Sequence, residues 1–286
     1  MAVAITAISF ASIFIRWSDA PPVVIAAYRM LFAALILLPF VLMRRNREEI
    51  VNLERRHWWL VLGIGMVLAL HFLAFNAALK ETTITSATIL VTCHPIVVGV
   101  LGYIYLKERP RHSGVGIAVG LIGVVVISSA DLSGGGIYGD LLALVGMLAA
   151  AVYLLGGRVF RQSIGVITYA FLLYITAAAV LFLVALGANA PLWPYPAEEL
   201  VIFFALAIVS TIFGHTILNW SLRYLPAAFV SVSMLGEPVG ASILAFLLLS
   251  ETPSLGVAIG GAMVLAGILL TAGSEMRSAS STSPSP

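Results

Sequence analysis

Long apolar runs dominate the hydrophobic pattern of the chain, and short polar or Gly- and Pro-rich stretches separate them. A helix needs about 20 apolar residues to cross the roughly 30 Å hydrocarbon layer of a bilayer. The pattern therefore predicts an all-α integral membrane protein with ten transmembrane helices. They are expected at about residues 2–17, 21–43, 57–79, 83–106, 112–129, 138–157, 165–187, 199–221, 226–249 and 255–272.

The same apolar pattern occurs twice along the chain. A shift of 143 residues lays residues 57–127 over residues 200–270 and pairs similar residues at matching points of the helices. The pairs are Asn76 with Asn219, Leu79 with Leu222, Lys80 with Arg223, Pro95 with Pro238, Leu106 with Leu249, Glu108 with Glu251 and Pro110 with Pro253. Such regular matches indicate a tandem duplication. We expect a first repeat at residues 1–134, a second at residues 135–275, and a disordered tail at residues 276–286.

The composition agrees with this pattern and reduces the number of possible functions. Apolar residues make up 61% of the chain and charged residues 10%, whereas charged residues are about a quarter of a soluble protein. Little chain is left for a soluble domain, so we expect the function to lie among the helices. The net charge of +2 gives no reason to expect a nucleic-acid partner. The sequence has no phosphate loop, no metal-ligand spacing and no nucleophile with its base, so we expect neither an enzyme nor a cofactor.

Lys and Arg residues favour one side of the predicted membrane. The richer side holds Arg44, Arg45, Arg47, Arg55, Arg56, Lys107, Arg109, Arg111, Arg158, Arg161, Arg223 and Arg277, and the other side only Arg16 and Lys80. By the positive-inside rule, both termini are cytoplasmic, and we expect a bacterial inner-membrane protein. Five spans per repeat is an odd number, so the second repeat must be inverted. Secondary transporters with inverted repeats bind substrate near the bilayer midplane, between the two repeats.

Several stretches resemble a known family. "AYRMLFAALILLP" at residues 27–39, "LGEPVGASILAFLLLSETPS" at residues 235–254, and the glycine-spaced helices after each "E-x-P" resemble the EamA-type members of the drug/metabolite transporter superfamily. "FIRWSDAPPVVIAAYRM" at residues 14–30 resembles the amino-acid and metabolite exporters of that family. The resemblance implies a basket of ten helices around a central cavity that opens to either side in turn.

The resemblance also implies a substrate. We expect export of aromatic or other neutral amino acids. A channel-like protein, or a permease of the same superfamily for drugs or other metabolites, is the alternative. Scattered polar groups and an inverted repeat favour alternating access over a continuous pore. The expected partners are a small-molecule substrate and the lipid bilayer, with a monomeric assembly.

Polar side chains at membrane depth are the candidate site residues. Ionisable groups in a bilayer are costly, so they face the protein interior or a wet cavity. Deep aromatic rings complete the expected cavity lining. The candidates are His71, Phe75, His94, Tyr153, His215, Asn219 and Glu237. The alternative is that the polar groups only bond neighbouring helices, which we favour for Asn76 and Asn219. For Arg29, which lies deeper than its helix start, we favour a structural pairing with an interior acid.

Two prolines occupy matched positions inside predicted helices. His94-Pro95 and Glu237-Pro238 each remove a backbone hydrogen bond and bend the helix, so Pro95 and Pro238 are candidate hinges. If Glu237 or His94 carried a coupling proton, transport would respond to a pH gradient. We favour a passive facilitator, because no acid and histidine share one helix face as an evident proton relay.

Overall fold

All regular structure in the described part of the chain is helical. The computed structural model describes residues 1–107, 113–130, 137–249, 255–256, 259–267 and 269–270. The first half contains α1 (Ala2–Trp17), α2 (Pro22–Val41), α3 (Arg44–Val51), α4 (Arg55–Glu81), α5 (Ile84–Val91), α6 (His94–Leu101), the π-helical η1 (Gly102–Leu106) and α7 (Ser113–Ala130). The second half contains α8 (Ile137–Phe160), α9 (Val166–Gly187), α10 (Ala197–Ala205), the π-helical η2 (Leu206–Thr216), α11 (Ile217–Ser221), α12 (Ala227–Ser233) and α13 (Gly236–Leu249).

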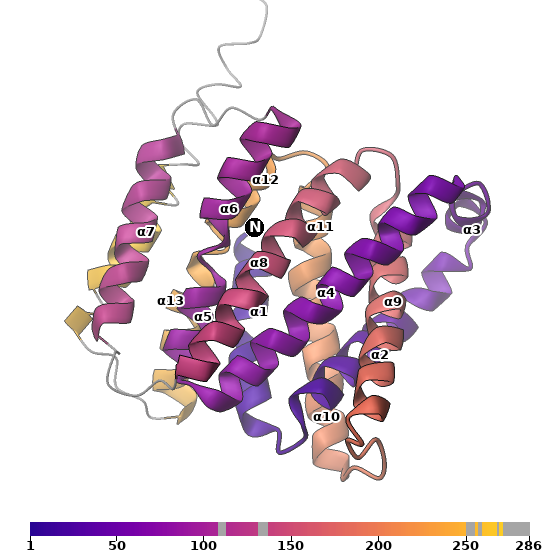
Figure 1. Ribbon diagram of the computed structural model, residues 1–286, viewed down its shortest axis with the longest axis horizontal. Coiled ribbons are helices and arrows are strands. Elements are labelled where there is room, and N and C mark those ends of the chain that lie inside the picture. Colours follow the sequence, from indigo (N-terminus) through magenta and orange to yellow (C-terminus); the bar gives the residue numbers. More distant parts are fainter. Residues whose placement is uncertain (108–112, 131–136, 250–254, 257–258, 268, 271–286) are drawn as a thin grey trace, which may run out of the picture.

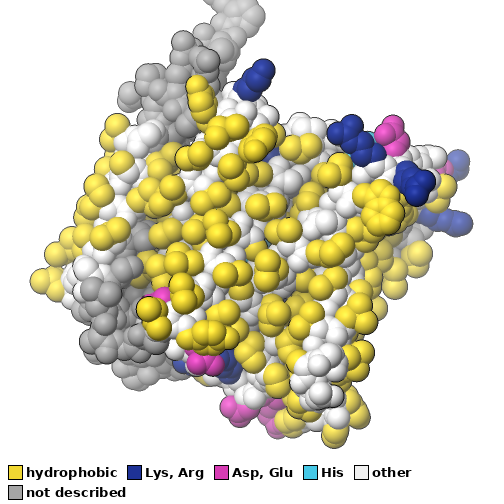
Figure 2. All heavy atoms as spheres, in the orientation of Figure 1, with side chains coloured by type: hydrophobic (Ala, Val, Ile, Leu, Met, Phe, Trp, Pro, Cys, Tyr) yellow, Lys and Arg dark blue, Asp and Glu magenta, His cyan; other side chains and the backbone are white. Residues whose placement is uncertain are grey.

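Seven stretches of the described chain are long and apolar enough to cross a membrane. They are Pro22–Val41, Arg55–Glu81, Ala87–Leu106, Ile137–Phe160, Val166–Gly187, Ala197–Ser221 and Ala227–Leu248, and two shorter apolar helices cover Ala2–Trp17 and Gly114–Gly123. Hydrophobic side chains cover the middle of the face in Figure 2, and charged side chains gather at its upper and lower margins. The chain is a multi-pass membrane protein, and the full count of ten spans stays a prediction.

The core joins the two halves of the chain. Helix α4 packs against α8 and α9, α2 packs against α9, and α1 packs against η2 and α13. Figure 1 shows α4 running diagonally across the bundle beside α8 and α9. Each of these contacts pairs an element of the first half with one of the second. A space at the centre of the bundle therefore lies between the halves.

The two helices that carry the matched prolines are broken, where the sequence predicts continuous helices with a bend. The predicted helix 83–106 divides at Thr92 and Cys93, and the predicted helix 226–249 divides at Met234 and Leu235. A proline lacks the N–H that would bond the carbonyl four residues earlier, and its ring crowds that carbonyl. Both breaks therefore fall just before the prolines, within one residue of the same point of each repeat.

Two further predictions need correction. The stretch at residues 44–56, which lies between two predicted spans, contains the short helix α3, in which Arg44 and Glu48 form an i,i+4 ion pair at 2.8 Å. Helix α4 then begins at Arg55 and includes the tryptophans at positions 58 and 59. The predicted helix 199–221 has a π-helical middle, η2, and hydropathy does not report this change of winding.

Candidate functional site

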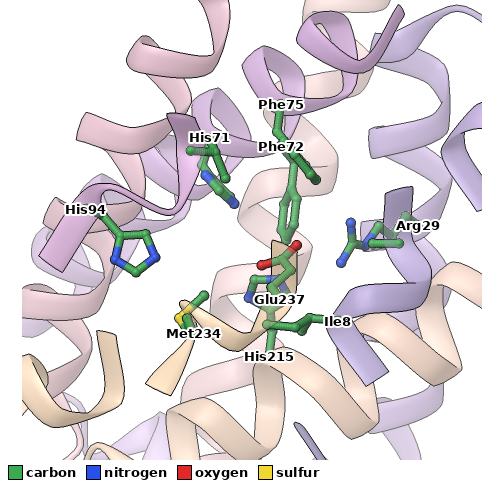
Figure 3. Close-up of a pocket in the computed structure, with 11 residues that line it drawn as sticks. Ile8, Arg29, His71, Phe72, Phe75, His94, His215, Met234 and Glu237 are labelled. Carbon is green, nitrogen blue, oxygen red and sulfur yellow. The ribbon is translucent and has the colours of Figure 1, made fainter. Parts of the chain in front are cut away.

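An enclosed cavity lies at the centre of the bundle, between the two halves. In this conformation it leaves about 10 Å³ for the centre of a water molecule, which is room for about one water. Figure 3 shows Glu237 in the middle of the view, with Arg29, His71 and His94 directed toward it from surrounding helices. The lining residues are Ile8, Ala11, Arg29, His71, Phe72, Phe75, Val91, His94, His215, Met234 and Glu237.

Most of the site residues expected from sequence meet in this cavity. They come from separate elements: the lining includes His71 and Phe75 from α4, His94 from α6, His215 from η2 and Glu237 from α13. Acid and histidine side chains that share no helix face are thus brought together by the packing of four elements. The two prolines stand directly after His94 and Glu237, so each helix break presents a polar side chain to the cavity.

Tyr153 and Asn219 are not among the lining residues. They bond each other, with the Tyr153 hydroxyl donating to Asn219 Oδ1 at 2.7 Å. Asn76, the repeat mate of Asn219, donates from Nδ2 to the carbonyl of Pro22 at 3.2 Å. Both asparagines therefore bond neighbouring helices, as expected for residues of this type at helix contacts.

His71 has a defined orientation. Its Nδ1 lies 2.9 Å from the carbonyl oxygen of Gly146 in α8. A carbonyl only accepts hydrogen bonds, so Nδ1 carries the hydrogen, and in the neutral ring Nε2 is left as an acceptor. The ring stacks on Phe75 with 6.2 Å between centroids and 6° between planes. His71 thus offers an acceptor beside an aromatic wall.

Other polar atoms in the cavity have no partner. Both ring nitrogens of His94 and Nδ1 of His215 are buried without a hydrogen bond. Buried polar atoms in folded proteins are nearly always bonded, so a group of unbonded ones in one cavity is typical of a ligand site. The central cavity is therefore the candidate binding site.

Arg29 also lines the cavity, where the sequence predicts only a structural pairing for it. Its side chain is 0% exposed, which excludes the outward snorkelling available to a long cationic side chain. Nε donates to Thr211 Oγ1 at 2.8 Å, and the guanidinium carbon lies 4.2 Å from the centroid of the Phe72 ring. The two terminal nitrogens, Nη1 and Nη2, have no hydrogen-bond partner.

The expected pairing of Arg29 with an interior acid is not found. Within the described residues, the ion pairs are Arg44–Glu48 and Glu54–His57, both at the surface. Arg29 and Glu237 thus line one cavity without forming an ion pair within 4.0 Å. The depth of Arg29 in α2 was a signal of a buried cation, but depth alone does not show which space the side chain enters.

A polar cluster lies at the end of the bundle that the charge pattern places outside. Lys80 donates to the carbonyl of Ser18, and the backbone N–H of Asp19 donates to Glu199 Oε1 at 2.6 Å. Arg16 donates to the carbonyl of Thr82 at 3.1 Å. These bonds tie α1 and the turn after it to α4 and α10.

A second cluster lies at the opposite end. Arg161, directly after α8, donates from Nε to the carbonyl of Asn219 at 3.0 Å and from Nη1 to the carbonyl of Ile164. Burial, followed by repulsion from Arg223, lowers the pKa of Arg161 from its ordinary value. The carboxylate of Glu49 accepts a hydrogen bond from the Gly165 N–H at 3.1 Å and joins α3 to the start of α9.

Comparison with known proteins gives consistent results. The model of the EamA-like transporter family matches residues 1–129 and 137–273. An uncharacterized transporter of Archaeoglobus fulgidus is 29% identical over 272 residues, with 92% of each chain covered. A second uncharacterized transporter of that organism is 31% identical over 207 residues, which are 67% of this chain and 70% of the relative. The uncharacterized transporter YoaV of Bacillus subtilis is 21% identical and covers 88% of this chain.

A solved structure shares the fold. It superimposes with a TM-score of 0.77 at 22% sequence identity, and the alignment covers 96% of each chain. At this identity the likeness extends to the arrangement of the helices and not to the chemistry of the site.

Proposed function

Because the chain belongs to the EamA-like transporter family, we propose that it is a secondary transporter that exports an aromatic or other neutral amino acid by alternating access. The observation that carries the proposal is the cavity between the halves, in which Arg29 and Glu237 are both buried and not paired with each other. A buried charge without a partner is costly, so such a pair is expected to serve a ligand.

The chemistry of the cavity supports the substrate class. Ligand sites usually have mostly apolar walls with a few placed polar groups. Phe72 and Phe75 supply aromatic walls, and Arg29 and Glu237 supply a guanidinium and a carboxyl group. A zwitterion with an apolar side chain matches both features. A sugar has no charge to offer these two groups, and a nucleotide carries several negative charges against one cation.

The packing of the halves supports alternating access. The sequence shift that relates the repeats carries α4 onto the stretch of α10, η2 and α11, and carries α1 onto α8. The contact of α4 with α8 thus has a counterpart in that of α1 with η2, and the contact of α6 with α8 has one in that of α1 with α13. Paired contacts are what a twofold relation between inverted repeats produces.

Counterflow in liposomes tests the function. Purified protein is reconstituted into liposomes loaded with unlabelled phenylalanine, and uptake of external labelled phenylalanine is followed. We expect saturable, transient accumulation of label, which Glu237→Ala abolishes and the exposed control Glu198→Gln leaves intact. Flux that does not saturate would indicate a pore. Counterflow of sugars or nucleotides without any amino acid would contradict the substrate class and favour the wider-specificity permease.

A further inference from the structure

Two donor groups in the central cavity have no acceptor. Nη1 and Nη2 of Arg29 are buried without a hydrogen bond, although the residue is 0% exposed. A buried guanidinium normally bonds carboxylate or carbonyl oxygens, because it loses its water on burial. Both nitrogens belong to the face of the fork that a carboxylate binds with two parallel hydrogen bonds.

The orientation of this fork is fixed by its surroundings. Nε is held by Thr211 Oγ1 at 2.8 Å, and the guanidinium plane lies over Phe72 at 4.2 Å from the ring centroid. The first contact uses Nε and the second uses one face of the guanidinium, so neither occupies the terminal nitrogens. Figure 3 shows the guanidinium directed from α2 toward the middle of the cavity.

Acceptors stand opposite this donor. The carboxylate of Glu237 points into the cavity from α13, and its side chain forms no hydrogen bond or ion pair with the described residues. His71 adds an acceptor at Nε2, because its Nδ1 is used by Gly146. A carboxylate and an imidazole nitrogen are suitable acceptors for the hydrogens of an ammonium group.

We propose that Arg29 binds the carboxylate of the substrate while Glu237, with His71 beside it, binds the ammonium group. This inference rests on the proposed function and names the two residues that select an α-amino acid. An amine would leave the fork of Arg29 unbonded, and a carboxylic acid would leave Glu237 unbonded. A site built to bond a polar group discriminates strongly against an analogue that lacks it, since the buried partner is then left unsatisfied.

Binding of matched ligands tests the assignment. Phenylalanine, 2-phenylethylamine and 3-phenylpropionate share the aromatic ring. Phenylalanine carries both charges, 2-phenylethylamine carries only the cation, and 3-phenylpropionate carries only the anion. Their dissociation constants are measured by calorimetry on the full chain in detergent, because amines cross lipid bilayers unaided. We expect wild type to bind each single-charge analogue at least about tenfold more weakly than phenylalanine.

Variants assign each charge to its residue. Arg29→Gln should abolish the preference for phenylalanine over 2-phenylethylamine and keep the preference for phenylalanine over 3-phenylpropionate. Glu237→Gln should keep the first preference and abolish the second. Arg29→Lys, which keeps the charge without the fork, should restore part of the lost preference. Arg161→Gln is the matched control, since Arg161 is also buried but donates to backbone carbonyls, and it should leave both preferences unchanged.

Each outcome has a separate meaning. If wild type binds no neutral amino acid, the proposed function fails. If wild type binds phenylalanine and 2-phenylethylamine equally, or if Arg29→Gln keeps the preference between them, the assignment of Arg29 is overturned while amino-acid transport stands. The comparison of the three ligands on wild type can overturn the assignment even if a variant does not fold.

Discussion

The buried hydrogen bond between Tyr153 and Asn219 predicts that loss of the Tyr153 hydroxyl lowers the stability of the fold. Tyr153→Phe removes the hydroxyl and leaves Asn219 Oδ1 without its donor. An unsatisfied buried acceptor costs about 1–3 kcal/mol, and hydrogen bonds between membrane helices tend toward the lower end of that range. We expect a lower midpoint of thermal unfolding in detergent. Tyr105→Phe, at a side chain that is 76% exposed, is the control. An equal effect of both variants would show that the bond between Tyr153 and Asn219 does not contribute to stability.

Glu237 carries a second prediction, which concerns energy coupling. A zwitterion adds no net charge to a cavity that holds one cation and one acid, so its binding requires no proton. We therefore expect passive transport, in which an imposed pH gradient across the liposome produces no accumulation above equilibrium in wild type. Accumulation in wild type that Glu237→Gln removes would contradict the facilitator and make Glu237 a proton carrier. The shared cavity of Glu237 and three histidines makes this test necessary.

Individual side chains were predictable from sequence as far as depth determines their place. His71, His94, His215 and Glu237 were expected at a site because charge is costly in a bilayer, and all four line the cavity. Depth does not give the direction in which a side chain leaves its helix. For that reason the sequence could not place Arg29 in the cavity. Tyr153, equally deep, bonds Asn219 and does not line the cavity.

The two broken helices predict that their prolines control movement. Pro238→Ala restores a backbone N–H and favours a continuous helix by up to about 3 kcal/mol. If the break is a hinge, the variant should slow counterflow while the dissociation constant of phenylalanine stays unchanged. Pro39→Ala is the matched control, because Pro39 also lies inside a helix, α2, but on its exposed side. Unchanged counterflow in Pro238→Ala would show that the break does not act as a hinge.

Hydropathy predicted most elements well but not how they are wound. The limits of α1, α4 and α9 agree closely with the predicted spans, since an apolar run ends where polar residues begin. The same measure cannot report the π-helical turns of η2, because winding depends on tertiary packing. It also assigned α3 to a loop, because a helix of polar residues at a membrane surface has no apolar run.

The molecule as a whole is organised by contacts between its two halves, which enclose the cavity. Sequence similarity between the repeats predicted two related halves, but the pairing of α4 with α8 and of α1 with η2 required the packed structure. The orientation in the membrane, with both termini cytoplasmic, stays a prediction from the positions of Lys and Arg.

The central claim is that one cavity opens to each side of the membrane in turn, and Ala11 allows a direct test. Ala11 lines the cavity, and Ala11→Cys in a Cys93→Ser background places one small thiol there. An impermeant thiol reagent is applied from either side of the membrane, with and without phenylalanine. Ala26→Cys, buried in α2 and not among the lining residues, is the control. Alternating access predicts labelling of Ala11→Cys from both sides and protection by phenylalanine from both. Labelling from one side only, or labelling that phenylalanine does not reduce, would contradict it.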